Sequence, residues 1–268
     1  MTELDVVGTV KEAYKGAWSH FADMMKLVWA PVALYATANV LYAGYIQGKL
    51  GGVEAEDMIS TMTKVWGWQV VAMFLLGLFL WPIIAVAWHR FVLLGETTSS
   101  AIYFKFGQRE ARFLLTTIFL SLLPMPGVLI VIVGAGTALS LVALPIGLVL
   151  IVAGAVYALR LSLLLPAIAT DAIVDARSIL EATEGNVLRI ISTHMLNLLC
   201  LVFLALAISL VGTVVAAFVG GVGTAIINTL LNVFGQIISV AILSIMYRDL
   251  ILGAAPLQAD NNSQPPLN

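Results

Sequence analysis

FLLTTIFLSLLPMPGVLIVIVGAGTALSLVALPIGLVLIVAGAVYAL, residues 113–159, is the stretch that decides the fold. It contains no Asp, Glu, Lys, Arg or His. A helix needs about 20 apolar residues to cross the roughly 30 Å of hydrocarbon in a bilayer, so this stretch is too long for one crossing. We therefore predict two transmembrane helices, over residues 113–135 and 138–165, divided near Gly134, Gly136 and Thr137.

The rest of the chain has the same apolar character. Hydrophobic residues make up 61% of the sequence and charged residues only 10%, far outside the range of soluble globular proteins. The apolar runs do not alternate as the strands of a membrane barrel would. Further transmembrane helices are predicted at residues 27–46, 66–94, 188–218 and 225–252. The sequence thus predicts an all-α polytopic protein with one six-helix transmembrane domain, residues 1–253, and a disordered polar tail, residues 254–268.

Shorter helices are predicted in the segments that flank and connect the spans. Between residues 4 and 22, apolar side chains such as Val10 and Ala13 recur at helical spacing, opposite Lys11 and Lys15. This pattern predicts an N-terminal amphipathic helix on the membrane surface. Two short interfacial helices are expected in the polar connections, one around residues 101–106 and one before residue 187.

The predicted helix before residue 187 has recognisable end signals. Ser178 and Glu181 have the spacing of a capping box at a helix start. Gly185 can end the helix in the left-handed conformation, and Asn186 can cap the fifth span.

The charge distribution predicts the orientation, because Lys and Arg accumulate on the cytoplasmic side of a membrane protein. With six spans, only Lys49 and Lys64 fall on the outer side. The other basic residues fall on one face, so both termini are expected to be cytoplasmic. That face carries Lys11, Lys15, Lys26, Arg90, Lys105, Arg109, Arg112, Arg160, Arg177, Arg189 and Arg248.

Ionisable side chains near the ends of the spans form the first candidate site. Such groups are costly close to hydrocarbon unless they are paired or hydrated. Two interpretations of Arg160 stay open: it needs a partner inside the protein, or it anchors lipid phosphates. We expect this cytoplasmic belt to contact lipid head groups or a partner protein; it consists of His89, Arg90, Glu96, Arg109, Arg112, Arg160 and Arg189.

Amides within the spans form the second candidate site. Thr224, Asn228, Asn232 and Gln236 recur every four residues and therefore share one face of the sixth span. Asn39 and Asn197, on other spans, are candidate hydrogen-bonding partners of this polar stripe. Such a stripe either joins helices or lines a path for a solute.

The motifs of known catalytic sites are missing from the sequence. The three histidines have no HExxH spacing, and neither a phosphate-binding GxxxxGK loop nor a GxSxG elbow occurs. We therefore expect no enzyme activity, no metal and no cofactor. A net charge of −2 without a long basic tract gives no reason to expect nucleic acid binding.

Four segments carry a resemblance to a known family: AVAWHRFVLLGE at 85–96, LRLSLLLPAIATD at 159–171, LEATEGNVLRI at 180–190 and SIMYRDL at 244–250. In these segments the chain resembles the glycerophosphoryl diester phosphodiesterase membrane-domain family and, more distantly, YciC-like inner-membrane proteins. The resemblance implies a multi-pass fold in a bacterial inner membrane, in an alphaproteobacterial branch. Phosphodiesterase activity in that family belongs to a separate soluble barrel, so the resemblance implies no activity for this chain.

Three functions are consistent with these features. The first is a non-enzymatic membrane module that contacts lipids or binds a membrane-protein partner or a second copy of itself through the cytoplasmic belt. The second is a transporter of a small solute or lipid that uses the polar stripe. The third is lipid chemistry at His89 and Glu96.

Overall fold

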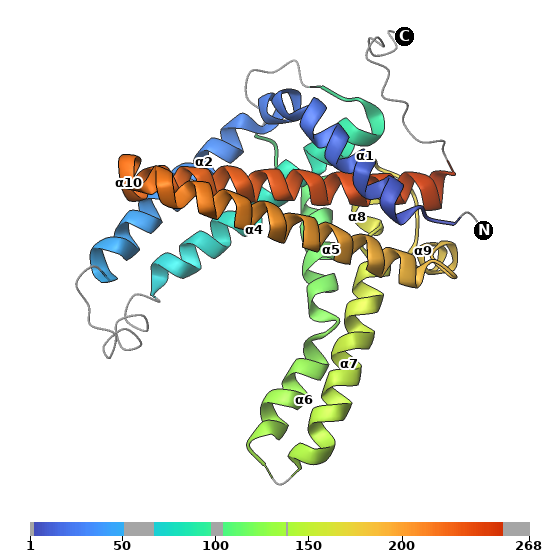
Figure 1. Ribbon diagram of the computed structural model, residues 1–268. Helices are drawn as coiled ribbons and strands as arrows, with labels where there is room; N and C mark the ends of the chain where they lie inside the picture. Colours follow the sequence, from blue (N-terminus) through green and yellow to red (C-terminus); the bar gives the residue numbers. More distant parts are fainter. Residues whose placement is uncertain (1–2, 51–66, 98–103, 138, 254–268) are drawn as a thin grey trace.

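The computed structural model describes residues 3–50, 67–97, 104–137 and 139–253 (Figure 1). Within these ranges the regular elements are helices, and no strand occurs. The predicted all-α polytopic fold is confirmed, whereas the predicted tail, residues 254–268, lies outside the described residues. Six stretches are long and apolar enough to cross a membrane: Phe21–Ile46, Trp68–Leu94, Gln108–Ala135, Ser140–Ala169, Val187–Ser209 and Ile226–Leu252.

Helix α1, Val6–Ser19, is amphipathic as predicted. Asp5 caps it by accepting a hydrogen bond of 3.0 Å from the Gly8 N–H. Val10 and Ala13 are buried. They pack against helix α10, along which α1 lies (Figure 1), so the apolar face is covered by protein and not by lipid alone.

Helices α2, Phe21–Leu50, and α4, Trp68–Leu94, pack against each other. α2 is kinked at Val28, three residues before Pro31, whose ring removes a helical N–H donor. Next to this kink, the buried Trp88 indole donates a hydrogen bond of 3.0 Å to the Met24 carbonyl. Trp88 therefore joins α4 to the irregular turn of α2.

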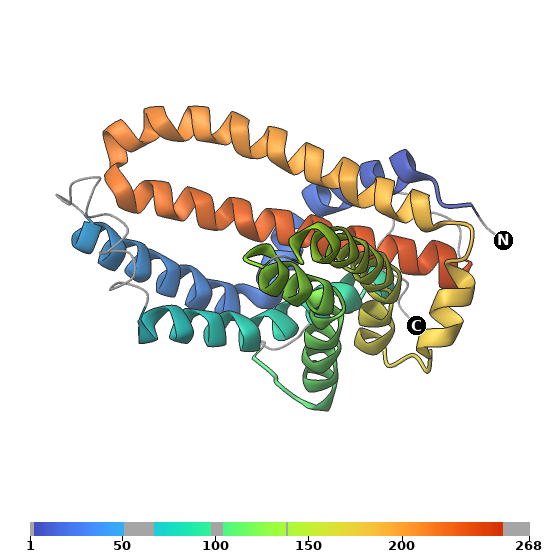
Figure 2. The same ribbon diagram turned by 90° about the horizontal axis from the view of Figure 1, so that it is seen from below.

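Helix α10, Val187–Tyr247, turns back on itself between residues 209 and 226 (Figure 2). Its two arms correspond to the fifth and sixth predicted spans, and Leu201 of the first arm lies against Gly235 of the second. The second arm continues into the π-helical turn η2, Arg248–Leu252. The core of the protein lies along this second arm, where Ile238 and Ile242 are fully buried.

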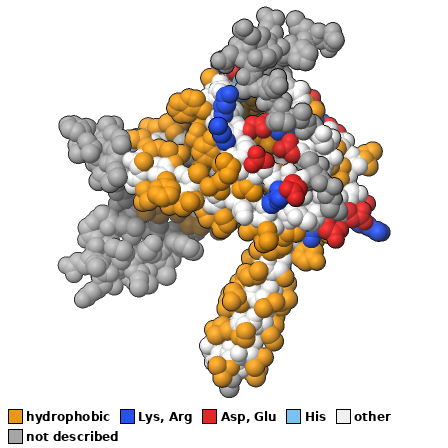
Figure 3. Space-filling model, turned by 45° about the vertical axis from the view of Figure 1, so that its right-hand side comes forward, with side chains coloured by type: hydrophobic (Ala, Val, Ile, Leu, Met, Phe, Trp, Pro, Cys, Tyr) orange, Lys and Arg blue, Asp and Glu red, His pale blue; other side chains and the backbone are white. Residues whose placement is uncertain are grey.

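The third and fourth spans are each divided into two helices. The third contains α5, Gln108–Leu122, and α6, Met125–Ala135; the fourth contains α7, Ser140–Leu161, and α8, Leu164–Ala169. α6 and α7 form a hairpin that projects crosswise to α2, α4 and both arms of α10 (Figures 1 and 2). Hydrophobic side chains cover its visible surface, while charged side chains gather on the body of the protein (Figure 3).

Glycines hold the α6–α7 hairpin together by letting the two backbones approach. A Cβ atom at Gly127 would lie 2.5 Å from the Gly147 carbonyl oxygen. A Cβ atom at Gly154 would lie 2.5 Å from the Leu123 carbonyl oxygen. The contact surface therefore excludes larger side chains at these positions.

Helix α9, Ala176–Ala182, is the short helix predicted before the fifth span, but its start differs. Asp175 is the cap, because its carboxylate accepts a hydrogen bond of 2.7 Å from the Ser178 N–H. The predicted Ser178–Glu181 capping box is therefore wrong, and Glu181 instead pairs with Arg177 at 2.8 Å. The predicted left-handed Gly185 is confirmed, with φ at 81°.

Two further local predictions have different outcomes. Asn186 does stand at the start of α10, yet its side chain makes no cap and accepts a hydrogen bond of 3.0 Å from the Leu4 N–H. The interfacial helix expected around residues 101–106 is not found in its described part, since residues 104–107 are not helical. Residues 101–103 lie outside the described residues.

Candidate functional site

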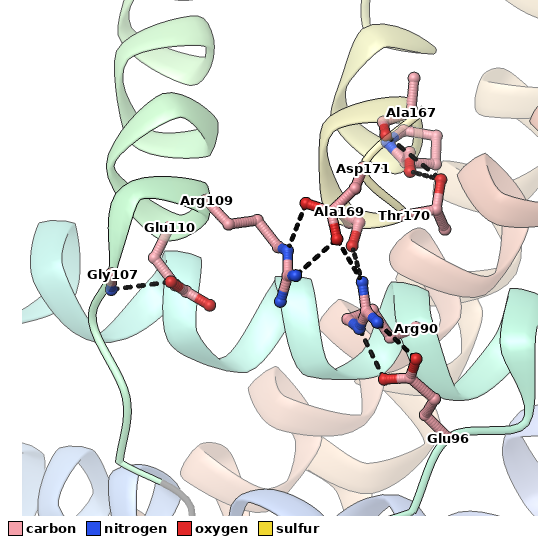
Figure 4. A network of polar contacts seen from close by, with 10 residues as sticks. Arg90, Glu96, Gly107, Arg109, Glu110, Ala167, Ala169, Thr170 and Asp171 are labelled. Atoms are coloured by element: carbon pink, nitrogen blue, oxygen red, sulfur yellow. Dashed lines mark hydrogen bonds and ion pairs between the residues drawn. The ribbon is translucent and has the colours of Figure 1, made fainter. Parts of the chain in front are cut away.

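A cluster of ion pairs lies where α4, α5 and the end of α8 meet (Figure 4). We call it the junction cluster; its members are Arg90, Glu96, Arg109 and Asp171. Arg90 donates to Asp171 at 3.1 Å, to the Ala169 carbonyl at 2.9 Å and to Glu96 through Nε at 2.6 Å. Arg109 donates through Nε at 2.9 Å to the other carboxylate oxygen of Asp171. Two of the predicted belt arginines are thus engaged with acids of the same chain.

Asp171 occupies an unusual backbone position at the centre of this cluster. Its φ is 58°, and among the described residues it is the only non-glycine in the left-handed region. Asp tolerates this region better than most residues. Hydrogen bonding from Arg109, with a further contribution from Arg90, holds the pKa of the Asp171 carboxyl below its usual range. The carboxylate therefore stays charged and joins the third span to the second.

A cavity of about 520 Å³ lies beside the junction cluster. It opens between the first turn of α5 and the segment that follows α8, at the ends of the third and fourth spans. Its size falls within the range of about 300–1,000 Å³ found for small-molecule sites. The cavity is lined by Lys105, Gly107, Gln108, Arg109, Glu110, Arg112, Ile168, Asp171, Ala172, Ile173, Val174 and Asp175.

Glu110 is the buried acid of this cavity, with 2% of its surface exposed. Its Oε2 accepts a hydrogen bond of 2.8 Å from the Gly107 N–H at the start of α5. Its Oε1 is buried and has no hydrogen-bond partner in the described part of the chain. Figure 4 shows this carboxylate beside the first turn of α5, on the side of the helix from which the Arg109 side chain extends toward Asp171. A buried carboxylate oxygen without a hydrogen-bond donor is energetically costly. A ligand with a donor group would lower this cost if it reached Oε1 of Glu110.

Two cations of the cavity wall are exposed, Lys105 and Arg112. Neither forms an ion pair with any acid that the structure describes. Of the predicted belt, Arg112 is therefore available for an external anion. Lys105 belongs to the same cavity, although the sequence analysis did not include it among the site residues.

Arg160 and Arg189 of the predicted belt bind the main chain of the protein itself. Arg160 donates to the Thr183 hydroxyl at 2.9 Å and to the Leu180 carbonyl at 2.5 Å, at the C-terminal end of α9. A cation at this end of a helix is favourable for the helix dipole. Of the two interpretations of Arg160, the structure favours the internal partner.

Arg189 connects the N-terminal segment to the start of α10. It donates to the Leu4 carbonyl at 3.1 Å and to the Glu3 carboxylate at 2.5 Å. Together with the bond from the Leu4 N–H to Asn186, this fixes the residues before α1.

His89 is separated from the charged members of the belt. It is 1% exposed, and its Nδ1 lies 2.7 Å from the Ser244 hydroxyl oxygen. That hydroxyl already donates to the Val240 carbonyl at 2.8 Å, so Nδ1 carries the proton and donates to Ser244. Glu96 instead pairs with Arg90 at the surface. The structure does not bring His89 and Glu96 together as a catalytic pair.

The amides of the predicted polar stripe do not meet their expected partners. Asn228 and Asn232 are exposed, and Gln236 donates to Asn232 at 2.5 Å on the same helix. Asn39 donates to the Tyr35 carbonyl of its own helix at 2.8 Å. The side chain of Thr224 lies outside the described part.

Asn197 has a role that the sequence analysis did not predict. It is buried and accepts a hydrogen bond of 3.3 Å from the Tyr14 hydroxyl of α1. Burial is the largest cause that raises the pKa of Tyr14 to about 12. The hydroxyl therefore stays a donor at neutral pH and links α1 to the first arm of α10.

Arg248 forms a second cluster of ion pairs. From the sequence, this residue was predicted only to lie on the cytoplasmic face. It binds Glu12 at 2.7 Å and Asp249 at 2.9 Å, and its side chain is 7% exposed. Glu12 precedes Arg248 by 236 residues. The sequence indicated this cluster only through the position of Arg248 within the apolar sixth span, where an arginine needs an acid nearby.

No metal site is apparent, because the described residues contain no group of three or more His, Cys, Asp or Glu side chains that could hold an ion. No family model matches the chain, and no curated protein or solved structure matches it either. The resemblance to the glycerophosphoryl diester phosphodiesterase membrane-domain family therefore stays a prediction.

Proposed function

We propose that this integral membrane protein is a non-enzymatic module that contacts phospholipid head groups. The observation that supports this function is the cavity at the ends of the third and fourth spans, whose wall contains the exposed Lys105 and Arg112. Cations at the end of a membrane span are well placed to bind lipid phosphates.

The exposed surface of α5 that follows Arg112 along the helix supports the same function. Leu115, Phe119 and Leu122 are exposed on α5. They follow Arg112 by three, seven and ten residues and therefore lie on the same face of the helix. An exposed apolar stripe that leads to an unpaired cation is complementary to a phospholipid, whose acyl chains are joined through glycerol to a phosphate.

The hydrogen bonds of the belt arginines also reduce the number of belt residues proposed to contact lipid. Arg90, Arg160 and Arg189 each bind acceptors of the same chain, so their guanidinium groups stabilise the fold. Lipid contact is accordingly assigned to Lys105 and Arg112. The location proposed for this module is a bacterial inner membrane with both termini cytoplasmic, on the basis of the basic residues and the family resemblance.

Native mass spectrometry of the purified protein tests this function. The wild type and the double variant Lys105→Gln/Arg112→Gln are placed in nanodiscs of mixed phospholipids and then released, and the lipids that remain bound are counted. The matched control is Arg177→Gln, an exposed arginine paired with Glu181 on α9.

We expect the double variant to retain fewer phospholipids than the wild type, and the control to retain as many. Equal retention in all three proteins overturns the function. A stoichiometric partner protein that co-purifies from native membranes, together with unchanged lipid retention, would replace it with a role in assembly.

A further inference from the structure

Beyond general lipid contact, we infer that the cavity at the start of α5 selects a zwitterionic phosphoethanolamine head group. This inference rests on the proposed lipid contact and adds the class of head group. In it, Lys105 and Arg112 bind the phosphate, and Glu110 accepts hydrogen bonds from the ammonium group.

The charges of the cavity wall favour a zwitterion. The wall contains three cations, Lys105, Arg109 and Arg112, and three acids, Glu110, Asp171 and Asp175. Two of the acids have partners, since Arg109 binds Asp171 and the Ser178 N–H binds Asp175. Two exposed cations and one buried acid thus stay available for a ligand that carries both signs of charge.

Glu110 disfavours a purely anionic ligand. A phosphate alone would neutralise Lys105 and Arg112 but would leave Oε1 of Glu110 without a donor. A purely anionic ligand would also add negative charge near this carboxylate with no positive group to offset it. The buried acid therefore requires a donor in the ligand, and a positively charged donor satisfies it best.

The number of N–H groups separates ethanolamine from choline. The ammonium group of ethanolamine has three N–H donors, as the side chain of lysine does. The quaternary nitrogen of choline has none and cannot donate to Oε1. A glycerol head group donates through hydroxyls but brings no positive charge to Glu110.

The position of Glu110 allows this contact. Glu110 lines the cavity, and the terminal torsion of a Glu side chain has broad minima. Oε1 is buried in the structure, so its contact with a ligand in the cavity requires a rotation of the carboxylate about this torsion. The N-terminal end of α5 also carries the positive end of the helix dipole, which favours phosphate beside it.

The test compares phospholipids in nanodiscs that contain equal amounts of phosphatidylethanolamine, phosphatidylcholine and phosphatidylglycerol. Native mass spectrometry gives the ratio of bound ethanolamine lipid to bound choline lipid. The variants are Glu110→Gln, which keeps the shape but loses the charge, and Lys105→Gln/Arg112→Gln. Glu181→Gln is the control, because Glu181 is an exposed acid on α9.

We expect the wild type to prefer ethanolamine lipid over choline lipid by about tenfold, the effect of one charge-assisted hydrogen bond. In Glu110→Gln this preference falls to near unity, because ethanolamine lipid loses the contact with the carboxylate whereas choline lipid, which never had it, is retained as in the wild type. In the double variant total retention falls. The control keeps both properties of the wild type.

The two proposals fail in different ways. Loss of retention in the double variant, with no ethanolamine preference in the wild type, overturns the head-group inference and leaves lipid contact in place. Unchanged retention in the double variant overturns both.

Two further measurements keep the inference open to contradiction. If Glu110→Gln does not fold, the wild-type preference itself is decisive, because equal retention of the two lipids contradicts the inference. The second measurement is thermal stabilisation in detergent by soluble phosphoethanolamine. Stabilisation without retention of the ethanolamine lipid would assign the cavity to a soluble ligand and overturn the inference that it binds a lipid head group.

Discussion

Arg248 binds both carboxylate oxygens of Glu12, at 2.7 and 3.0 Å, across 236 residues of sequence. The pair joins the end of the sixth span to α1, the helix that precedes the first span. A bidentate pair of this kind fixes both distance and orientation.

Replacing Glu12 with Gln should lower the free energy of unfolding by about 2–3 kcal/mol. The buried arginine would lose one of its two acids and keep Asp249, and the Glu12 side chain is 24% exposed, so the cost is below that of breaking a fully buried pair. Thermal unfolding in detergent measures the change. The control is Lys11→Gln, at an exposed position of the same helix, and equal losses in both variants would contradict the assignment.

Arg160→Met should loosen α9 while leaving the spans folded. The Thr183 hydroxyl and the Leu180 carbonyl would lose the hydrogen bonds that Arg160 donates to them, at a cost of about 1–3 kcal/mol. Hydrogen exchange of residues 176–183 should become faster, as mass spectrometry can measure. Arg177→Met, on the exposed side of α9, should leave the exchange unchanged. Unaltered exchange in Arg160→Met would show that α9 does not depend on this cation.

The Asp171 carboxyl should make stability dependent on pH in the acid range. Its pKa in the folded protein is depressed, chiefly by Arg109, from a usual value of 3.8. Its contribution is therefore present above that value and is lost as pH falls through the lower folded pKa. Thermal stability recorded between neutral pH and pH about 3 should decline at the acid end.

Asp171→Asn is the matched variant for this pH dependence. Asn also tolerates the left-handed backbone that Asp171 adopts, so the substitution removes the charge without adding strain. The variant should be less stable at neutral pH and should show a shallower acid decline. An identical pH profile would contradict the role of Asp171.

Gly127→Ala should separate the backbones of the α6–α7 hairpin. The new Cβ would lie 2.5 Å from the Gly147 carbonyl oxygen, and main-chain atoms on both sides cannot yield easily. We expect a loss of about 1–3 kcal/mol in the free energy of unfolding. The control is Gly136→Ala at the tip of the hairpin, where a Cβ meets no atom within 4 Å. Similar stability of the two variants would mean that the close approach is not required.

The sequence predicted the spans well because their signal is local. Length and apolar composition suffice to recognise a membrane helix, and the helical spacing of the apolar residues between 4 and 22, opposite Lys11 and Lys15, sufficed to recognise α1. The predicted cap of α9 was wrong because both Asp175 and Ser178 are residue types that cap helices. The helix begins after Asp175, whose carboxylate accepts a hydrogen bond from the Ser178 N–H, so Ser178 lies inside the first turn.

The site was less predictable because its residues come from distant segments. Arg109 and Asp171 are 62 residues apart, and no periodic pattern connects them. Gln236 was expected either to join helices or to line a path for a solute, and its side chain donates to Asn232, an amide four residues away on its own helix. The belt was recognised by its charges, whereas the partner of each charge depends on the packing of the spans.

The crosswise α6–α7 hairpin has a consequence for insertion into a membrane (Figure 1). Each set of helices is long enough to need most of the roughly 30 Å of hydrocarbon, and two crosswise sets cannot both stand along the normal of one flat bilayer. The ion pairs of Asp171 with Arg90 and Arg109 lie at the base of the hairpin, where α4, α5 and the end of α8 meet (Figure 4). They therefore tie the orientation of the hairpin in the bilayer to that of α4.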